Sequence, residues 1–127
     1  MNSTLLRKLI KISQLHYDLP SSRSKHFSFL LLRNKIISFG WNKSLKTHPL
    51  SKKYNYRFEC IHAEFDAIRN CPYPPAILSR CRLVVLRIRS NGKLGLSKPC
   101  QHCQKVLRDF GVGAVVYSTN DGLFKEL

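Results

Sequence analysis

The first part of the chain repeats apolar residues at the three- and four-residue spacing of an amphipathic helix. The apolar positions are Leu5, Leu6, Leu9, Ile10 and Ile12. This spacing predicts a helix from about Thr4 to Tyr17, with Ser3 as its N-cap and Leu19-Pro20 as its stop. The opposite face carries basic side chains, so we expect the helix to bury one face and expose a positively charged one.

Two apolar segments rich in Phe, Leu and Ile follow this helix. They run from Lys25 to Arg33 and from Lys35 to Trp41, and Asn34 joins them. Their length and composition predict a β-hairpin. Between Asn42 and Arg57 the periodicity is lost and basic residues collect, which predicts a loop.

The second half of the chain alternates helical and extended patterns. We expect a helix from near Cys60 to just before Cys71, followed by a proline-rich turn. The apolar run from Cys81 to Arg89 predicts a buried strand, and Asn91-Gly92 predicts a tight turn after it. A further helix is expected from Cys100 to Phe110, because Gly111 follows as a stop.

The end of the chain decides the topology. Ala114 to Ser118 predicts a strand, and the nine residues after it are too few for a crossover helix. A further strand near Leu123 to Lys125 must therefore turn back at Asn120-Asp121-Gly122 and run antiparallel. We expect an α/β fold, a three-layer α-β-α arrangement with a mixed sheet of four to five strands, the last one short. Residues 1-127 are expected to form a single domain.

The charge of the chain changes the expected partner. The 22 Lys and Arg against seven Asp and Glu give a net charge of +15. The imbalance is concentrated in residues 1-57, which hold twelve basic residues against Asp18 alone, whereas residues 58-127 hold ten basic and six acidic residues. Such a field attracts polyanions, so a phosphate-bearing partner is expected, although a basic solvated surface is an alternative explanation.

The lengths of the apolar runs and the number of cysteines indicate in which compartment the protein is expected. The longest apolar runs, such as Phe29 to Leu32 and Leu83 to Leu86, are far shorter than the ~20 residues of a membrane span. We therefore expect a soluble protein with no membrane partner. Five cysteines without a secretory signal suggest a reducing, intracellular and cytoplasmic location. The basic, serine-rich residues 1-33 also resemble a mitochondrial transit peptide, but the helical pattern favours a structural role.

Two short motifs in the second half carry metal-binding chemistry. The first is His62-Ala63-Glu64, and the second is Pro99-Cys100-Gln101-His102-Cys103. His62, Cys100 and Cys103 supply three ligands of the kind that bind zinc, and the motifs supply no fourth. A zinc ion held by one imidazole and two thiolates keeps one tetrahedral position open for water, which distinguishes catalytic from structural zinc. We expect one catalytic Zn2+ per chain.

Other interpretations of the same residues stay open. Cys60 could complete a closed structural site with His62, Cys100 and Cys103, although the gap is much longer than the roughly 12 to 15 residues of a zinc finger. A redox C-x-x-C pair is possible in a reducing compartment, but it leaves His62 and Glu64 without a role. An intact site without activity is a third alternative.

The order H-x-E followed by P-C-x-x-C is similar to the signature of the zinc deaminases that act on nucleobases. The chain therefore resembles the cytidine and deoxycytidylate deaminase superfamily. The resemblance implies that Glu64 is the catalytic residue: it takes a proton from water, passes it to the ring nitrogen beside the amino-bearing carbon, and protonates the departing ammonia. It also implies a homo-oligomer.

The resemblance further implies residues that contact the substrate. Asn42 would bind the sugar, the backbone N–H of Ala63 would meet the base carbonyl, and Ser97 would line the pocket floor. The reaction expected is conversion of a cytidine or deoxycytidine nucleotide, CMP or dCMP, to its uracil form with release of ammonia. Basic residues between positions 43 and 57 would neutralise the phosphate.

Two alternatives to a free pyrimidine nucleotide remain. The same pocket could take a cytosine, or less readily an adenine, from single-stranded DNA or RNA, with Tyr54 or Tyr56 stacking on flanking bases. A protein of another class, a zinc-stabilised nucleic-acid-binding module without turnover, would carry the same ligands. Glu64 discriminates this last alternative, because a binding module should tolerate its replacement by Gln.

Overall fold

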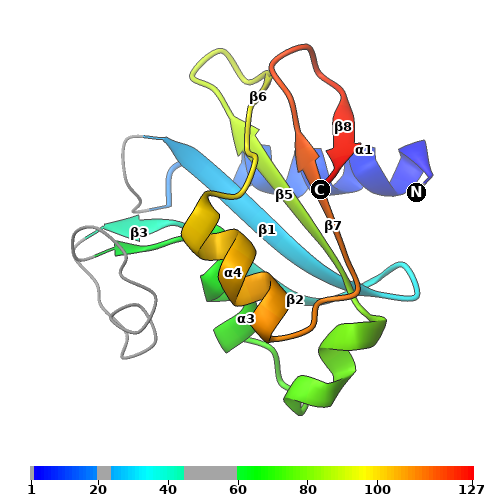
Figure 1. Cartoon of the computed structure of the whole chain (residues 1–127). Helices are drawn as coiled ribbons and strands as arrows, with labels where there is room; N and C mark the ends of the chain where they lie inside the picture. Colours follow the sequence, from blue (N-terminus) through cyan, green and yellow to red (C-terminus); the bar gives the residue numbers. More distant parts are fainter. Residues whose placement is uncertain (1, 20–23, 45–59) are drawn as a thin grey trace.

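A mixed β-sheet forms the middle layer of the protein (Figure 1). The computed structural model describes residues 2–19, 24–44 and 60–127. The strands of this sheet are β1 (Lys25–Leu32), β2 (Lys35–Trp41), β5 (Arg82–Ile88), β6 (Leu94–Gly95), β7 (Ala114–Ser118) and β8 (Phe124–Glu126). Their order is β2-β1-β5-β7-β8, and β6 pairs with β5. The β5–β7 pair is parallel, whereas the other pairs are antiparallel.

Helices cover both faces of the sheet (Figure 1). Helix α1 (Ser3–Leu15) packs on one face, and α3 (Ala63–Arg69) and α4 (Gln101–Asp109) pack on the other. The 3₁₀-helix η1 (Pro75–Arg80) leads into β5. The three-layer α/β arrangement and the antiparallel last strand predicted from the sequence are therefore confirmed. The sheet has six strands, slightly more than predicted, because the short β6 forms after the Asn91-Gly92 turn.

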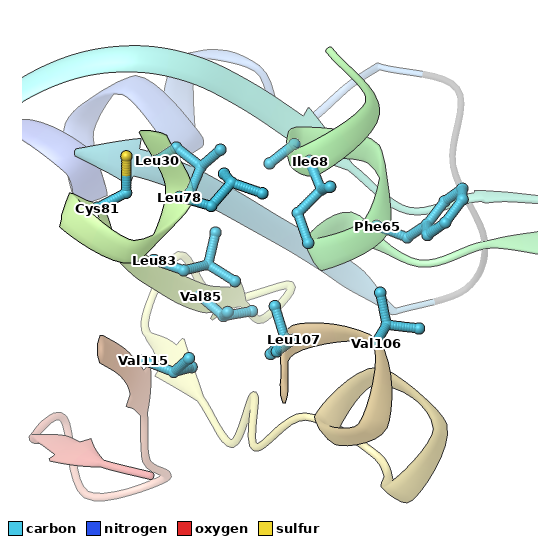
Figure 2. Close-up of a cluster of buried hydrophobic side chains, with 11 residues drawn as sticks. Leu30, Phe65, Ile68, Leu78, Cys81, Leu83, Val85, Val106, Leu107 and Val115 are labelled. Atoms are coloured by element: carbon cyan, nitrogen blue, oxygen red, sulfur yellow. The ribbon is translucent and has the colours of Figure 1, made fainter. Parts of the chain in front are cut away.

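The side chains of β5 divide the interior into two cores. Leu83 and Val85 face α3 and α4, where they pack with Leu30, Phe65 and Leu107 (Figure 2). Val84, Leu86 and Ile88 alternate with them and pack on the α1 side with Leu5, Leu9, Phe27 and Phe29. This two-residue alternation gives the face of every β5 side chain.

The β1–β2 hairpin closes with a two-residue turn at Arg33 and Asn34, one residue longer than the connection at Asn34 that the sequence predicted. Arg33 and Asn34 have φ values of 49° and 64°. Two successive left-handed residues make the type I′ turn, whose twist matches that of the flanking strands. The register runs from Leu32 opposite Lys35 to Phe27 opposite Trp41. The pairing shifts by one residue between Leu30 and Leu31, so the turn and this irregularity together set which β2 residues lie beneath α3.

Several predicted boundaries were wrong. The first helix is capped by Asn2 rather than Ser3, since the Leu5 N–H donates to Asn2 Oδ1 at 2.7 Å, and it ends at Leu15 before the expected Tyr17. The second helix begins at Ala63, not near Cys60.

Helix α3 begins later than predicted because the residues before it pair with a distant part of the chain. Strand β4 (Cys60–Ile61) pairs with strand β3 (Lys43–Ser44) in a separate two-stranded sheet. The first residues of the predicted 42–57 loop are therefore extended. The rest of that loop, including Tyr54 and Tyr56, lies outside the described residues.

Polar groups on the sheet fix α3 against β1 and β2. Ser28 Oγ donates to the Ala63 carbonyl, and Ser38 Oγ donates to the Ala67 carbonyl at 2.6 Å. A side chain at Gly40 would place its Cβ 2.4 Å from Ala67 N. The helix backbone thus lies directly on the strands. None of the described helices is long and apolar enough to cross a membrane.

Candidate active site

Two helix N-termini bring the predicted metal ligands together. His62 is the N-cap of α3, and Cys100 is the N-cap of α4, following Pro99. Cys103 lies one turn into α4 and is buried. One donor atom of each ligand lies within 4.8 Å of the others. The sequence motifs, far apart along the chain, therefore meet in one site.

The spacing of the donors fits zinc. His62 Nδ1 lies 3.4 Å from Cys103 Sγ and 3.7 Å from Cys100 Sγ. Ligands held about 2.0–2.3 Å from an ion at tetrahedral angles lie roughly 3.4–3.8 Å apart, so the separations match a Zn2+ bound by one nitrogen and two sulfurs. Within the described residues no further His, Cys, Asp or Glu joins this group. The side chain of Cys60, the alternative fourth ligand, lies outside them.

The electrostatics of Cys100 favour a metal-binding thiolate. The pKa of Cys100 is lowered to about 3, chiefly by a hydrogen bond with Cys103 and further by His62, while burial opposes the shift. The Cys103 backbone N–H also points at Cys100 Sγ, at 3.5 Å. A helix N-terminus stabilises a thiolate in this way. At neutral pH this ligand is already ionised.

Glu64 lies one residue into α3, almost completely buried with 6 % of its surface exposed. Burial raises the pKa of its carboxyl, and this outweighs the charge of His62 and a hydrogen bond with Cys103, which lower it. The carboxyl therefore lies beside the ligands in an environment that favours its protonated form. A group that must accept and release a proton near pH 7 needs a pKa raised in this direction.

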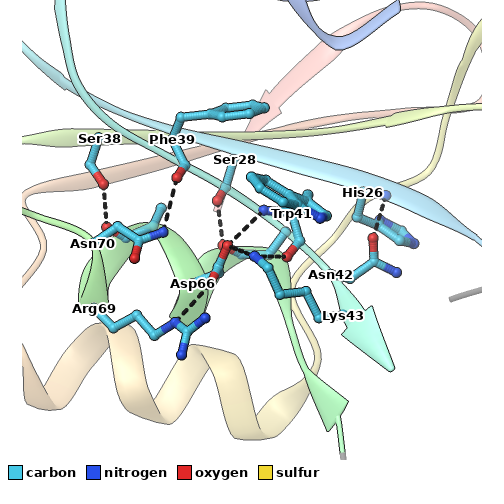
Figure 3. Close-up of polar contacts among 12 residues, drawn as sticks. His26, Ser28, Ser38, Phe39, Trp41, Asn42, Lys43, Asp66, Arg69 and Asn70 are labelled. Atoms are coloured by element: carbon cyan, nitrogen blue, oxygen red, sulfur yellow. Dashed lines mark hydrogen bonds and ion pairs between the residues drawn. The ribbon is translucent and has the colours of Figure 1, made fainter. Parts of the chain in front are cut away.

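The predicted substrate residues lie around the start of β1. Asn42 Oδ1 accepts the His26 N–H at 3.0 Å (Figure 3). Its Nδ2 donates to the Ser24 carbonyl at 2.6 Å. Ser97 Oγ lies 2.8 Å from His26 Nδ1. Both side chains are mostly buried, and Ala63 adjoins His62 as the first residue of α3. The structure thus connects Asn42 and Ser97 through one histidine.

That histidine was missed by the sequence reasoning. His26 is a partly buried residue of β1, and its pKa is lowered to about 4 by burial and by the charges of Arg87 and His62. It is therefore neutral at pH 7. A single polar residue at the start of an apolar strand gave no signal of such a position.

Asp66 was missed as well. Its side chain is fully buried and accepts from Lys43, from Arg69 Nε at 2.7 Å and from the Trp41 N–H at 3.1 Å (Figure 3). The Lys43 ammonium also lies 3.6 Å from the centre of the Trp41 ring. The spacing of three residues between Asp66 and Arg69 in the predicted helix is the signal that could have identified Asp66.

Known proteins resemble this chain in sequence and in fold. Residues 1–119 match the family described as "Cytidine and deoxycytidylate deaminase zinc-binding region". No curated protein matches the chain.

Solved structures show the same fold. The cytidine deaminase from Burkholderia pseudomallei is 18% identical, with 100% of this chain and 92% of that chain covered and a TM-score of 0.64. The dCMP deaminase from the cyanophage S-TIM5 in its apo form is 21% identical, with 97% and 90% covered and a TM-score of 0.58. The same phage enzyme in complex with dCMP and dUMP is 19% identical, with 94% and 85% covered and a TM-score of 0.57.

Proposed function

This chain belongs to the zinc-dependent cytidine and deoxycytidylate deaminases, and on this basis we propose that it hydrolyses CMP or dCMP to the uracil nucleotide with release of ammonia. The observation that carries the proposal is the meeting of His62, Cys100 and Cys103 beside the buried carboxyl of Glu64. Three ligands leave one tetrahedral position for a reacting water.

The protein groups divide the chemistry between them. When bound, zinc supplies a Lewis acid that lowers the pKa of water from about 15.7 toward 7. Glu64 accepts a proton from the attacking water and delivers it to the ring nitrogen beside the amino-bearing carbon. It then transfers the second proton of that water to the amino group, which leaves as ammonia while the carbonyl forms. The raised pKa of Glu64 supports this exchange.

The residues around the base have positioning roles in this proposal. The N–H of Ala63 belongs to the first turn of α3, where backbone donors lack helical acceptors, and it would meet the base carbonyl. Ser97 would form part of the pocket floor, held by its contact with His26. Asn42, oriented by its two backbone hydrogen bonds, would present its amide to the sugar.

Replacement of Glu64 by Gln tests the reaction. We expect Glu64→Gln to retain one zinc per chain, because the side chain is not a ligand, and to lose roughly 100- to 10,000-fold in ammonia release, the usual size of an acid–base contribution. Zinc content and ammonia production from CMP would be measured. Glu126→Gln, an exposed carboxylate in β8, is the matched control and should keep full activity. An undiminished rate for Glu64→Gln would contradict the catalytic assignment and favour a non-catalytic zinc module.

A polynucleotide substrate is the second candidate, because a net charge of +15 exceeds what one phosphate requires. CMP, dCMP, cytidine and cytosine-bearing oligonucleotides would be incubated with the zinc-loaded protein. Conversion of monomers alone rejects a strand substrate, and conversion of oligonucleotides alone rejects the proposed one.

A further inference from the structure

Two arginines near the predicted pocket floor have buried nitrogens without a hydrogen-bond partner in the described part of the chain. The Nε atoms of Arg87 and Arg89 are buried, and no atom of the described residues accepts a hydrogen bond from them. A buried donor without an acceptor destabilises the folded state, so natural proteins seldom leave one unless a ligand or water occupies the position. The described residues therefore supply no acceptor for either Nε atom.

Arg87 lies on the catalytic face of the sheet. Leu83 and Val85 of β5 pack toward α3 and α4, and strand alternation gives Arg87 the same face. Its cross-strand partner on β1 is His26, whose Nδ1 lies 2.8 Å from Ser97 Oγ. The charges of Arg87 and of the ligand His62 both act on His26. The Arg87 side chain thus belongs to the same cluster as the predicted pocket floor.

Gly95 makes room for both arginines. It lies opposite Arg87 in the β5–β6 pair. A Cβ at Gly95 would lie 3.1 Å from Arg87 Cδ and 3.0 Å from Arg89 Cγ, so both side chains cross this residue closely. Their stems are therefore held in place, while β5 runs toward the end of the sheet at which α4 begins (Figure 1).

Within residues 2–19, 24–44 and 60–127, no acidic side chain forms an ion pair with either arginine. Among the described residues, the ion pairs are those of Asp66 with Lys43 and with Arg69. His26, the titratable neighbour across the strand, is neutral at pH 7 and does not change the net charge of this cluster. A planar guanidinium with free N–H groups binds phosphate oxygens by paired, charge-assisted hydrogen bonds.

We propose that Arg87, with Arg89 beside it, binds the phosphate of the substrate and makes this deaminase select nucleotides over nucleosides. The inference rests on the proposed function, because it assigns the substrate class of the same pocket. It places the phosphate at the C-terminal end of β5, among described residues, rather than at the 43–57 segment expected from the sequence.

The test compares substrates that differ only by the phosphate. In zinc-loaded protein, Arg87→Gln should lower kcat/KM for CMP and dCMP roughly 10- to 100-fold, the effect of losing a hydrogen bond to a charged group. The loss should lie mainly in KM, and kcat/KM for cytidine and deoxycytidine should change less than about threefold. Arg87→Lys should restore part of the CMP activity. Arg80 is an exposed arginine in η1. Arg80→Gln removes the same charge at a distance and should leave kcat/KM unchanged for both the nucleotides and the nucleosides.

The outcomes separate this inference from the proposed function. An unchanged CMP-to-cytidine ratio in Arg87→Gln overturns the phosphate site while deamination itself stands. If the wild type converts no monomer, the phosphate site is tested by binding instead. Calorimetry then compares the affinity of CMP for zinc-loaded Glu64→Gln with its affinity for the same protein carrying Arg87→Gln as well. An Arg87-dependent affinity then supports the site although the proposed reaction has failed, and an Arg87-independent affinity overturns it. Zinc content and circular dichroism identify a variant that has not folded, for which Arg89→Gln is the substitute.

Discussion

Asp66 connects three parts of the site through one fully buried carboxylate. It accepts from Lys43, at the start of the β3–β4 pair, from the Trp41 backbone and from Arg69 one turn along α3. The charge on Lys43, whose side chain is 12 % exposed, is compensated mainly here. A buried ion pair is costly to break from one side, because the remaining charge stays in the interior.

We therefore expect Asp66→Asn to lower the free energy of unfolding by about 3 kcal/mol. Arg69→Gln, which removes the more exposed partner and leaves Lys43 paired, should lower it by less than about 1 kcal/mol. Urea denaturation of the three zinc-loaded proteins measures both values. Equal effects of the two substitutions would show that the Lys43 pair has no special weight.

His26 gives the protein a pH dependence of known sign. Its pKa is about 4 in the folded protein, because of burial and then the charges of Arg87 and His62, against 6.5 for a free histidine. Between these values the unfolded chain binds a proton that the native state does not, so the free energy of unfolding falls as the pH falls from 6.5 toward 4.

The loss that His26 causes should be on the order of 2 kcal/mol across that window. His26→Asn should unfold at lower denaturant throughout, because it loses the contact with Ser97, and should show a flatter pH dependence than the wild type. Denaturation at pH 7 and pH 5 compares the two, and zinc release affects both alike. Parallel curves for the two proteins would argue against this role of His26.

Single residues with a strong chemical signature could be predicted from the sequence, and those defined by their neighbours could not. His62, Cys100 and Cys103 form the group expected, because their spacing is tied to helix starts. His26 and most partners of Asp66 lie on strands distant in sequence, so only the Asp66–Arg69 spacing is visible as a local pattern.

At the scale of elements, β2 and α3 approach each other closely at Gly40. A Cβ on Gly40 would lie 2.4 Å from Ala67 N and 2.7 Å from the Ala63 carbonyl. Both are backbone atoms of α3, which cannot move aside as a flexible side chain can. The helix that carries Glu64 can therefore pack on β2 only because position 40 is a glycine.

Gly40→Ala is expected to destabilise the protein by about 3 kcal/mol or to prevent zinc binding, because overpacking of this kind forces backbone shifts. Gly122→Ala is the comparison, since its Cβ would meet open space and only its φ of 80° is unfavourable; it should lose roughly 1 kcal/mol. Thermal unfolding and zinc content measure both. A Gly40→Ala protein as stable as Gly122→Ala would contradict the close packing.

Elements with strong periodicity were predicted well, whereas the start of α3 and the cap of α1 were not. The hairpin, the β5 strand and α4 lie within one or two residues of their predicted ranges, because apolar spacing and turn residues define them locally. The α3 start was displaced because Cys60–Ile61 pairs with Lys43–Ser44, a long-range contact without a local signal. The α1 cap fell on Asn2 because Asn and Ser are comparable caps and lie side by side.

At the scale of the whole molecule, the charge should govern encounters more than turnover. Part of the excess lies on α1, whose exposed face carries Arg7, Lys8 and Lys11. Single-stranded nucleic acid binds such surfaces with an affinity that falls with salt by a log–log slope of about 0.7 per phosphate contacted.

We expect a cytosine-bearing oligonucleotide to bind the zinc-loaded protein with a slope corresponding to several phosphates. The kcat/KM for CMP should change with a slope no greater than about one, because one phosphate enters the pocket. Fluorescence anisotropy and ammonia release at two salt concentrations measure the pair. If kcat/KM for CMP falls with salt as steeply as the oligonucleotide affinity does, turnover depends on the overall positive charge of the protein.

The shortness of α3 has a consequence for how new specificities could arise. Seven residues are too few for a helix to persist by itself in water. Its tilt is therefore inherited from Ser28, Ser38 and Gly40 on the strands beneath it. Directed evolution could re-aim the proton-carrying group by repacking this strand surface, leaving every residue that a substrate contacts unchanged.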